Sequence, residues 1–108
     1  EIQNPKSILG FRVFRPALRA VVEVDQGIPK QINAWDKQRS VYGRVVNLAG
    51  PWRTTGDWWR NDRWARDEWD IAIEPASGIQ LPSERPAALY RIYRELDSGM
   101  WFVEGSYD

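Results

Sequence analysis

Apolar and polar residues alternate with a period of two along several short stretches of this chain. The first stretch spans residues 18–25, where every second side chain is apolar. Successive side chains of a β-strand point to opposite faces, so this pattern predicts a strand with one buried face. Gln26-Gly27 predicts a turn, and residues 30–35, with Ile32 as the clearest core position, predict the returning strand. The predicted inward residues of the first strand are Leu18, Ala20, Val22 and Val24.

Later stretches repeat the strand pattern. After a polar turn at residues 36–40, residues 41–48 are rich in β-branched side chains and are expected to end at Ala49-Gly50-Pro51. Residues 68–74 alternate cleanly, with Trp69, Ile71 and Ile73 on the apolar face. Residues 87–96 and 100–107 flank the Gly-containing connection Asp97-Ser98-Gly99, which predicts a hairpin. In that hairpin Tyr90 and Ile92 would face Trp101 and Val103, which leaves Arg91 and Tyr93 on the other face.

These patterns predict a mostly-β fold. We expect a small antiparallel sheet of about six strands, curled into a barrel-like arrangement or packed as a sandwich. No stretch has a convincing amphipathic helical pattern, although residues 60–68 could hold a helical turn. Residues 1–16, interrupted by Pro5 and Pro16, are expected to form a lead-in segment. Residues 17–108 are expected to form one domain, with a long Trp-rich loop and a Pro/Ser/Gly-rich loop at 75–86.

Composition narrows the possible chemistry. Fifteen basic residues balance fifteen acidic ones, so no overall field favours nucleic acid or a membrane surface. The chain contains no Cys and no His, which excludes disulfides, thiolate metal sites and catalysis by a Ser-His-Asp triad or a Cys nucleophile within it. We therefore expect no enzyme activity, cofactor or metal. The first residue, Glu1, and the lack of a signal-peptide pattern favour a domain excised from a longer protein.

The stretch GPWRTTGDWWRNDRWARDEWD, residues 50–70, concentrates the candidate functional residues. Its acids, Asp57, Asp62, Asp67, Glu68 and Asp70, could form a carboxylate pair for acid–base chemistry or an oxygen-ligand metal site. Four arginines lie among them, however, and the spacing does not fit a calcium loop. The glycines of this stretch match neither phosphate-binding fingerprint. We interpret the acids as members of ion pairs and turn caps. The arginines are Arg53, Arg60, Arg63 and Arg66.

The tryptophans of the same stretch have three possible roles: packing in a small core, contacting a partner protein, or stacking on unpaired bases. Trp58 and Trp59 are adjacent, so in an extended segment they point to opposite sides and cannot both enter a one-sided core. One of them, or Trp64, is therefore a candidate for an exposed aromatic side chain. The five tryptophans are Trp52, Trp58, Trp59, Trp64 and Trp69.

Two long segments carry a family resemblance. AGPWRTTGDWWRNDRWARDEWDIAI, residues 49–73, and ALYRIYRELDSGMWFVEGSYD, residues 88–108, closely resemble the C-terminal end of ImuB-type proteins. Residues 14–32, FRPALRAVVEVDQGIPKQI, resemble the same family more loosely. ImuB-type proteins are catalytically degenerate relatives of the Y-family DNA polymerases. The resemblance covers most of the chain.

The resemblance implies a non-catalytic scaffold of a bacterial mutasome, active in damage-induced, error-prone translesion synthesis. Implied partners are a recombinase-like accessory protein, an error-prone replicative-type polymerase and, through upstream regions, the sliding clamp. Residues 80–84 begin like the family's clamp-binding peptide but lack its apolar ending, so we do not assign a clamp site to them. The implied location is cytoplasmic and nucleoid-associated, and the lack of cysteine fits a reducing compartment.

The Trp/Arg-rich loop is the expected partner-binding site, with arginines engaging acidic partners and an exposed Trp as the anchor. The alternative is a module that binds single-stranded nucleic acid through the same loop, which the neutral net charge does not favour. No membrane partner is expected. The expected partner-binding residues are Trp52, Arg53, Asp57, Trp58, Trp59, Arg60, Trp64 and Arg66.

Overall fold

The structure of the chain, a computed structural model, describes residues 10–56, 65–74 and 88–107. This described part contains six β-strands and no helix, and it confirms the prediction of a mostly-β fold. Three of the connections between strands are described, and they fall where turns were predicted: residues 26–27, 36–39 and 96–100. The strands are β1 (Phe11–Asp25), β2 (Ile28–Trp35), β3 (Ser40–Thr55), β4 (Ala65–Glu74), β5 (Ala88–Glu95) and β6 (Trp101–Tyr107).

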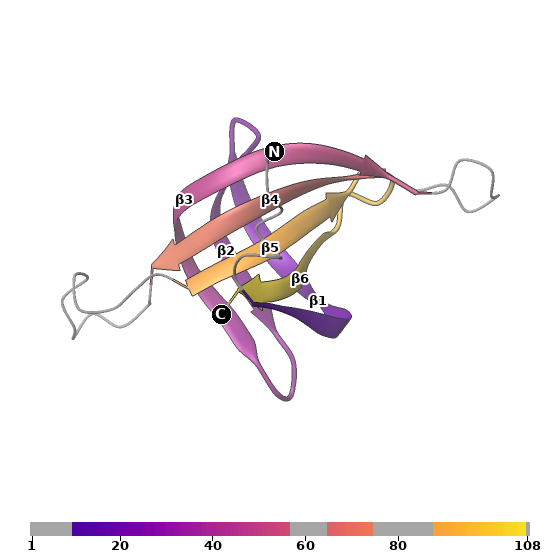
Figure 1. Ribbon diagram of the computed structural model, residues 1–108. Coiled ribbons are helices and arrows are strands. Elements are labelled where there is room, and N and C mark those ends of the chain that lie inside the picture. Colours follow the sequence, from indigo (N-terminus) through magenta and orange to yellow (C-terminus); the bar gives the residue numbers. More distant parts are fainter. Residues whose placement is uncertain (1–9, 57–64, 75–87, 108) are drawn as a thin grey trace.

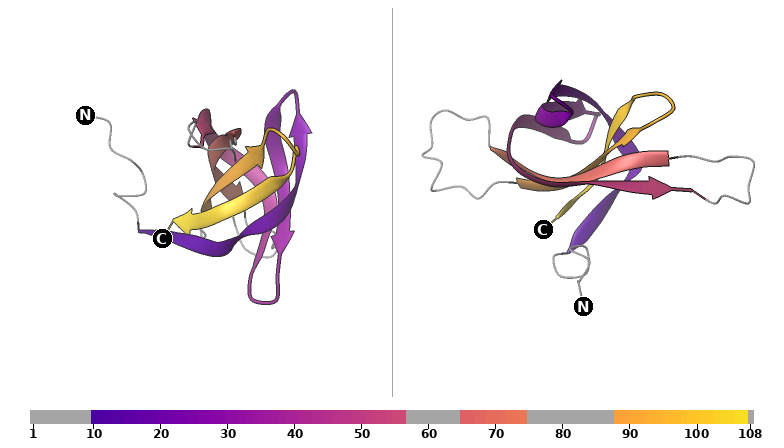
Figure 2. Two further views of the ribbon diagram at one scale, coloured as in Figure 1. Left: turned by 90° about the vertical axis from the view of Figure 1, so that its right-hand side faces the viewer. Right: turned by 90° about the horizontal axis from the view of Figure 1, so that it is seen from above.

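Each strand pairs antiparallel with the next one along the chain, and β6 pairs with β1, so the sheet closes on itself (Figure 1). The left view of Figure 2 shows β1 and β6 side by side where the ring closes. Of the two predicted arrangements, the barrel-like one is therefore observed and the sandwich is not. The long strand β3 pairs with β2 through residues 40–44 and with β4 through residues 44–55, so it bends from one half of the ring to the other.

The core lies inside the ring and consists of the inward face of each strand. Trp69, Ile71 and Ile73 are all buried, as the alternation in β4 predicted. Ile92 of β5 lies opposite Val103 of β6, and both side chains have no exposed surface, which confirms the inward face of the hairpin. The remaining buried members of the core cluster are Phe14, Leu18, Ala20, Ile32, Ala34 and Val41.

The prediction was wrong for Val24, which is 45% exposed. The pairing of β1 with β2 shifts between Glu23 and Val24, so the alternation that begins at Leu18 does not continue inward to this position. The hairpin contains a similar irregularity. A shift between Arg91 and Ile92 places Tyr90 opposite Ser106, although Tyr90 still packs against the core cluster.

β1 and β3 extend furthest beyond their predicted ends, and both contain a proline. β1 begins at Phe11, within the expected lead-in, and contains Pro16 where its pairing with β6 is interrupted between Val13 and Leu18. β3 was expected to end before Gly50-Pro51, but it continues to Thr55. Proline lacks the N–H that a regular ladder requires, and irregular positions tolerate it. The pairing of β3 with β4 is irregular between Ala49 and Trp52, which accommodates the proline.

β4 begins at Ala65, so residues 65–68 form strand and not the helical turn that residues 60–68 could have held. Gly50 has a positive φ of 118°, and a Cβ atom at this position would lie 2.6 Å from the carbonyl oxygen of Glu68. A glycine is therefore required where β3 approaches β4 so closely. Beyond this irregularity the pairing resumes with Trp52 opposite Glu68, which brings the tryptophan onto the outer face of the sheet.

Candidate functional site

Three of the eight expected partner-binding residues belong to the described part of the chain. They are Trp52 and Arg53 on β3 and Arg66 on β4. The other five, Asp57, Trp58, Trp59, Arg60 and Trp64, lie outside the described residues. The same is true of the candidate acid Asp62 and of Arg63. The described site is therefore built on the paired strands that flank this segment.

Trp52 is an exposed aromatic residue, with 44% of its surface accessible. It follows the irregular step in β3, and its ring lies on the outer face of the sheet, opposite Glu68. The guanidinium carbon of Arg91, which is buried on β5, lies 5.3 Å from the centroid of this ring. A cation at that distance is attracted by the ring's quadrupole. One side of Trp52 therefore contacts the protein, while much of the ring remains accessible to a partner.

Arg53 is bound to an acid of the same stretch. Its Nε donates to Oδ1 of Asp67 at 2.6 Å and its Nη2 donates to Oδ2 at 3.2 Å, which is a bidentate pair. The hydrogen bond to Asp67 raises the pKa of Arg53 above its ordinary value. The Arg53 side chain is still 64% exposed, so the pair lies at the surface. The interpretation of Asp67 as an ion-pair residue is confirmed.

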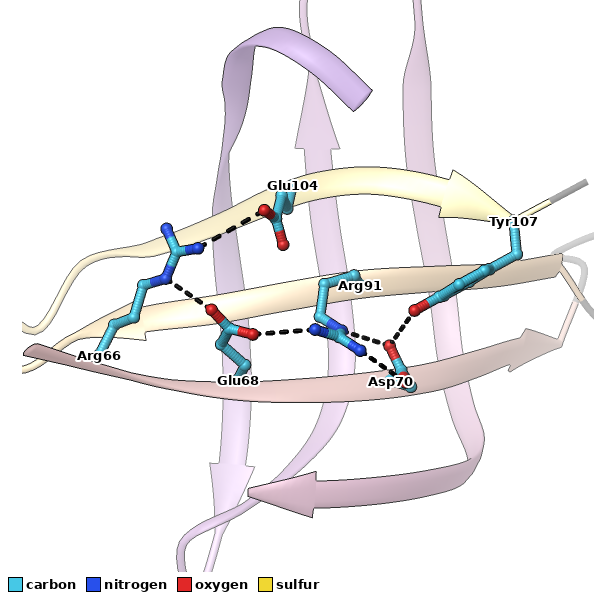
Figure 3. A network of polar contacts seen from close by, with 6 residues as sticks. All are labelled: Arg66, Glu68, Asp70, Arg91, Glu104 and Tyr107. Carbon is cyan, nitrogen blue, oxygen red and sulfur yellow. Dashed lines mark hydrogen bonds and ion pairs between the residues drawn. The ribbon is translucent and has the colours of Figure 1, made fainter. Parts of the chain in front are cut away.

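A larger network of polar contacts covers the outer face of β4, β5 and β6 (Figure 3). Nε of Arg66 donates to Oε2 of Glu68 at 2.7 Å, and Nη1 of Arg91 donates to Oε1 of the same carboxylate at 2.9 Å. Arg91 also binds Asp70 through two hydrogen bonds, the one from Nη2 to Oδ2 measuring 3.0 Å. Two residues of β6 complete the network. Nη2 of Arg66 lies 3.5 Å from Oε2 of Glu104, and the Tyr107 hydroxyl donates to Oδ1 of Asp70 at 2.7 Å.

The centre of the network is buried although it faces away from the core. Glu68 is 7% exposed and Arg91 is 8% exposed. Aromatic side chains contribute to this burial: the guanidinium of Arg66 lies 4.0 Å from the centroid of the Tyr93 ring, which stacks on Phe102. Burying a charge is costly unless it is paired and hydrogen-bonded, and here each carboxylate oxygen of Glu68 receives a guanidinium N–H. Through Arg91, this layer of ion pairs and aromatic rings contacts the ring of Trp52.

The pKa shifts of Arg91, Tyr93 and Tyr107 all favour the protonated form. Burial of Arg91 disfavours its charge, but the hydrogen bonds and charge of Asp70, with help from Glu68, outweigh this effect and raise its pKa. Burial and the hydrogen bond to Asp70 raise the pKa of Tyr107, so its hydroxyl remains a donor. Burial likewise raises the pKa of Tyr93. A group that neither gains nor loses a proton near neutral pH is a poor general acid or base.

Two hollows border this network, and the larger, of about 400 Å³, is lined by Ala65, Arg66, Tyr93, Glu95 and Asp97. Asp70 and Tyr107 border a hollow of about 190 Å³ together with apolar side chains such as Leu48 and Leu89. Typical small-molecule sites measure roughly 300–1,000 Å³. The smaller hollow lies below this range and the larger lies within it. Among the described residues, no group of three or more acidic side chains is arranged to hold a metal ion.

Sequence reasoning had placed Arg91 and Tyr93 together on the face opposite the core, and the structure confirms this. It missed the partnership of Arg91 with Glu68 and Asp70, and it missed Glu104 and Tyr107 altogether. The sequence feature that could have identified Arg91 is its position as a charged residue at the centre of a predicted strand. Assigning its partners requires the register of β4 against β5, in which Asp70 lies opposite Arg91 and Glu68 opposite Tyr93.

No helix in the part of the chain covered by the structure is long and apolar enough to cross a membrane. Comparisons with protein-family models, with curated proteins and with solved structures found no match to this chain.

Proposed function

We propose that this domain is a non-catalytic protein-interaction module of a Y-family-polymerase-like scaffold that acts in damage-induced, error-prone translesion DNA synthesis. The translesion context is supported by the resemblance of residues 49–73 and 88–108 to the C-terminal end of ImuB-type proteins. The observation that carries the interaction role is Trp52, an exposed tryptophan held over a buried ion-pair network. Both segments that carry the resemblance contribute to this surface.

Trp52 has the properties of a binding anchor. Tryptophan is enriched among the few residues that dominate protein–protein affinity, and a preordered side chain loses less entropy on binding. The contact with Arg91 restricts the Trp52 ring, and Arg91 is itself held by two hydrogen bonds to Asp70. We therefore assign the contact role to Trp52. Arg53 and Arg66 already bind Asp67 and Glu68, so their role is to position the strands that present it.

A non-catalytic role is supported by the state of the acids. Asp67, Glu68 and Asp70 were candidates for acid–base chemistry, and each of them binds an arginine. The hydroxyl beside Asp70 belongs to Tyr107, whose raised pKa makes it a poor base. The sequence supplies no histidine or cysteine that could take over these roles.

Capture of purified proteins tests the proposal. The 108-residue chain is immobilised and exposed to the recombinase-like accessory protein and the error-prone polymerase of a mutasome of the ImuB type. We expect at least one of them to bind, with Trp52→Ala weakening the affinity about tenfold or more. Ile28→Ala is the matched control, because Ile28 is 42% exposed but lies on β2.

Three results would count against the proposal. Failure of the wild-type chain to bind either protein would remove the interaction role in this complex. Binding of a single-stranded oligonucleotide that quenches tryptophan fluorescence and weakens steeply with salt would favour the nucleic-acid alternative. Equal partner affinity of Trp52→Ala and the wild type would show that the contact surface lies elsewhere on the domain.

A further inference from the structure

A second exposed apolar surface lies on the outer face of β1, β2 and β3, away from the ion-pair network. Val21, Asn33 and Tyr42 are directly opposite one another across these three strands. Trp35 follows Asn33 on the same face of β2 and is 62% exposed, while Val21 is 66% exposed and Tyr42 is 50% exposed. Exposed apolar side chains that gather in this way mark interaction sites more often than scattered ones do.

A groove of about 560 Å³ adjoins this surface, which is within the range of binding pockets. Its lining includes Val21 and Trp35, together with Met100 of the turn after β5 and Trp101, the first residue of β6. The left view of Figure 2 shows this turn beside the strands of the β1–β2 hairpin. The groove therefore lies next to Ala20 and Trp101, the last pair of residues that joins β1 to β6.

One wall of the groove is an edge of β1. The pairing of β1 with β6 ends at Ala20 opposite Trp101, whereas residues 21–25 pair with β2 alone in the described part of the chain. The edge of these residues that faces away from β2 thus has backbone groups available for a further strand. Extended peptides bind such edges by adding a strand, with backbone hydrogen bonds for affinity and side-chain pockets for specificity.

The charged side chains around the groove indicate which charge a partner should carry. Arg19 lines it, and Nη2 of Arg94 lies 3.7 Å from the position of a Cβ atom at Gly99. None of the described lining residues is acidic, and the exposed acids of β1, Glu23 and Asp25, lie beyond them toward the turn into β2. Neither Arg19 nor Arg94 forms an ion pair with a described carboxylate, unlike Arg53, Arg66 and Arg91. Two such cations beside an apolar groove complement a segment that is both acidic and apolar.

We propose that this groove binds an extended acidic peptide segment of a partner protein. The segment adds to the edge of β1 at Val21 and Val22, before the acidic Glu23 and Asp25, and places an apolar side chain against Trp35 and Met100. Its carboxylates face Arg19 and Arg94. This proposal adds a binding site to the interaction module and rests on its own geometry, not on the contact assigned to Trp52.

Synthetic peptides test the proposal with the 108-residue chain alone. The probe is a blocked, fluorescein-labelled peptide, Asp-Glu-Val-Leu-Val-Asp-Glu, whose binding is followed by fluorescence anisotropy at low salt. The comparison peptides replace the acids by lysine or the three apolar residues by serine. We expect the probe to bind and both comparison peptides to bind at least about tenfold more weakly. Amide NMR shifts should cluster at Val21, Val22 and Met100.

Arg19→Glu and Trp35→Ala should each weaken the probe by about tenfold or more. Both side chains are exposed, so these variants should fold, and Trp35→Phe should retain part of the affinity. The matched controls are Lys30→Glu and Ile28→Ala, exposed residues of β2 that do not line the groove, and both should bind like the wild type. Thermal unfolding of each variant separates loss of binding from loss of the fold.

Several results would overturn the proposal: no binding of the probe, equal binding of the lysine peptide, or amide shifts confined to another face. Self-association that Trp35→Ala abolishes would assign the surface to a second copy of the chain. Binding of an oligonucleotide in the groove would assign it to nucleic acid. Because no mutasome protein is present, a negative result here leaves capture through Trp52 unaffected, and the reverse also holds.

Discussion

Arg91 on β5 and Asp70 on β4 lie opposite each other and form a bidentate ion pair on the outer face of the barrel. The pair joins two strands within a surface that the alternation of β4 predicted to face solvent. Arg91 also binds Glu68, so one buried guanidinium contacts two carboxylates. Arg91 is therefore the residue that connects these two carboxylates.

Arg91→Met should destabilise the domain by about 3–5 kcal/mol, because it leaves the Asp70 carboxylate without its cation in a partly buried site. Urea unfolding followed by tryptophan fluorescence measures this change. Arg44→Met is the control: Arg44 pairs with Glu74 on the same sheet, but its side chain is 69% exposed, and its loss should cost about 1 kcal/mol or less. Similar losses from both variants would show that the buried Arg91–Asp70 pair adds no more stability than an exposed ion pair does.

Alkaline pH should destabilise the fold through its tyrosines. The pKa of Tyr90, Tyr93 and Tyr107 is raised in the folded state, mainly by burial. The unfolded chain therefore loses these protons first. Their contribution to stability is complete below the ordinary tyrosine pKa of about 10 and is lost as the pH rises beyond it.

Urea unfolding between about pH 8 and pH 11 should show this decline. Tyr107→Phe, which cannot ionise at this position, should have a smaller decline than the wild type. Tyr107→Phe should also be less stable near neutral pH, because it lacks the hydroxyl that donates to Asp70. An identical pH dependence of the two proteins would exclude Tyr107 as a source of the decline.

Gly43→Ala should destabilise the domain by more than Gly27→Ala. A Cβ atom at Gly43 would lie 2.4 Å from Cγ2 of Ile73 and 2.6 Å from the carbonyl oxygen of Glu74, so β3 and β4 would have to separate. Gly27 lies in a turn with a positive φ of 78° but has no atom within 4 Å of such a Cβ. Its substitution should cost only the backbone strain, about 1 kcal/mol.

The comparison is made by thermal unfolding of the two variants under one set of conditions. We expect about 3 kcal/mol or more for Gly43→Ala, a magnitude that is typical of overpacking combined with a displaced backbone. Equal costs would mean that the approach of β3 to β4 at this position relaxes freely.

The tryptophans should divide by strand face. Trp69 is 4% exposed and packs against Trp101 at a centroid distance of 4.9 Å, so Trp69→Ala should cost about 3–5 kcal/mol. Trp52→Ala removes an exposed ring and should cost about 1 kcal/mol, chiefly its contact with Arg91. Urea unfolding measures both losses. Comparable losses would assign Trp52 to the structural layer and weaken its role as a contact residue.

The local pattern of apolar, polar and turn residues predicted much of this fold. The period-two alternation identified the inward residues of β4 and the facing pair Ile92 and Val103, because side-chain direction in a strand follows directly from the backbone. Turn residues marked three connections correctly. The mixture of acids and arginines in residues 50–70 also predicted ion pairs, and Asp67 with Arg53 confirms it.

The tertiary structure alone decided what depends on register and closure. The pairing of β6 with β1 selected a closed ring over a sandwich, and no local pattern specifies which distant strands meet. Irregular pairing carried β3 past Gly50-Pro51 and turned Val24 outward. The burial of Glu68 and Arg91 on the outer face arises because strands distant in sequence bring opposite charges and aromatic rings together there. Alternation encodes the direction of a side chain, but its partners are set by how the strands assemble.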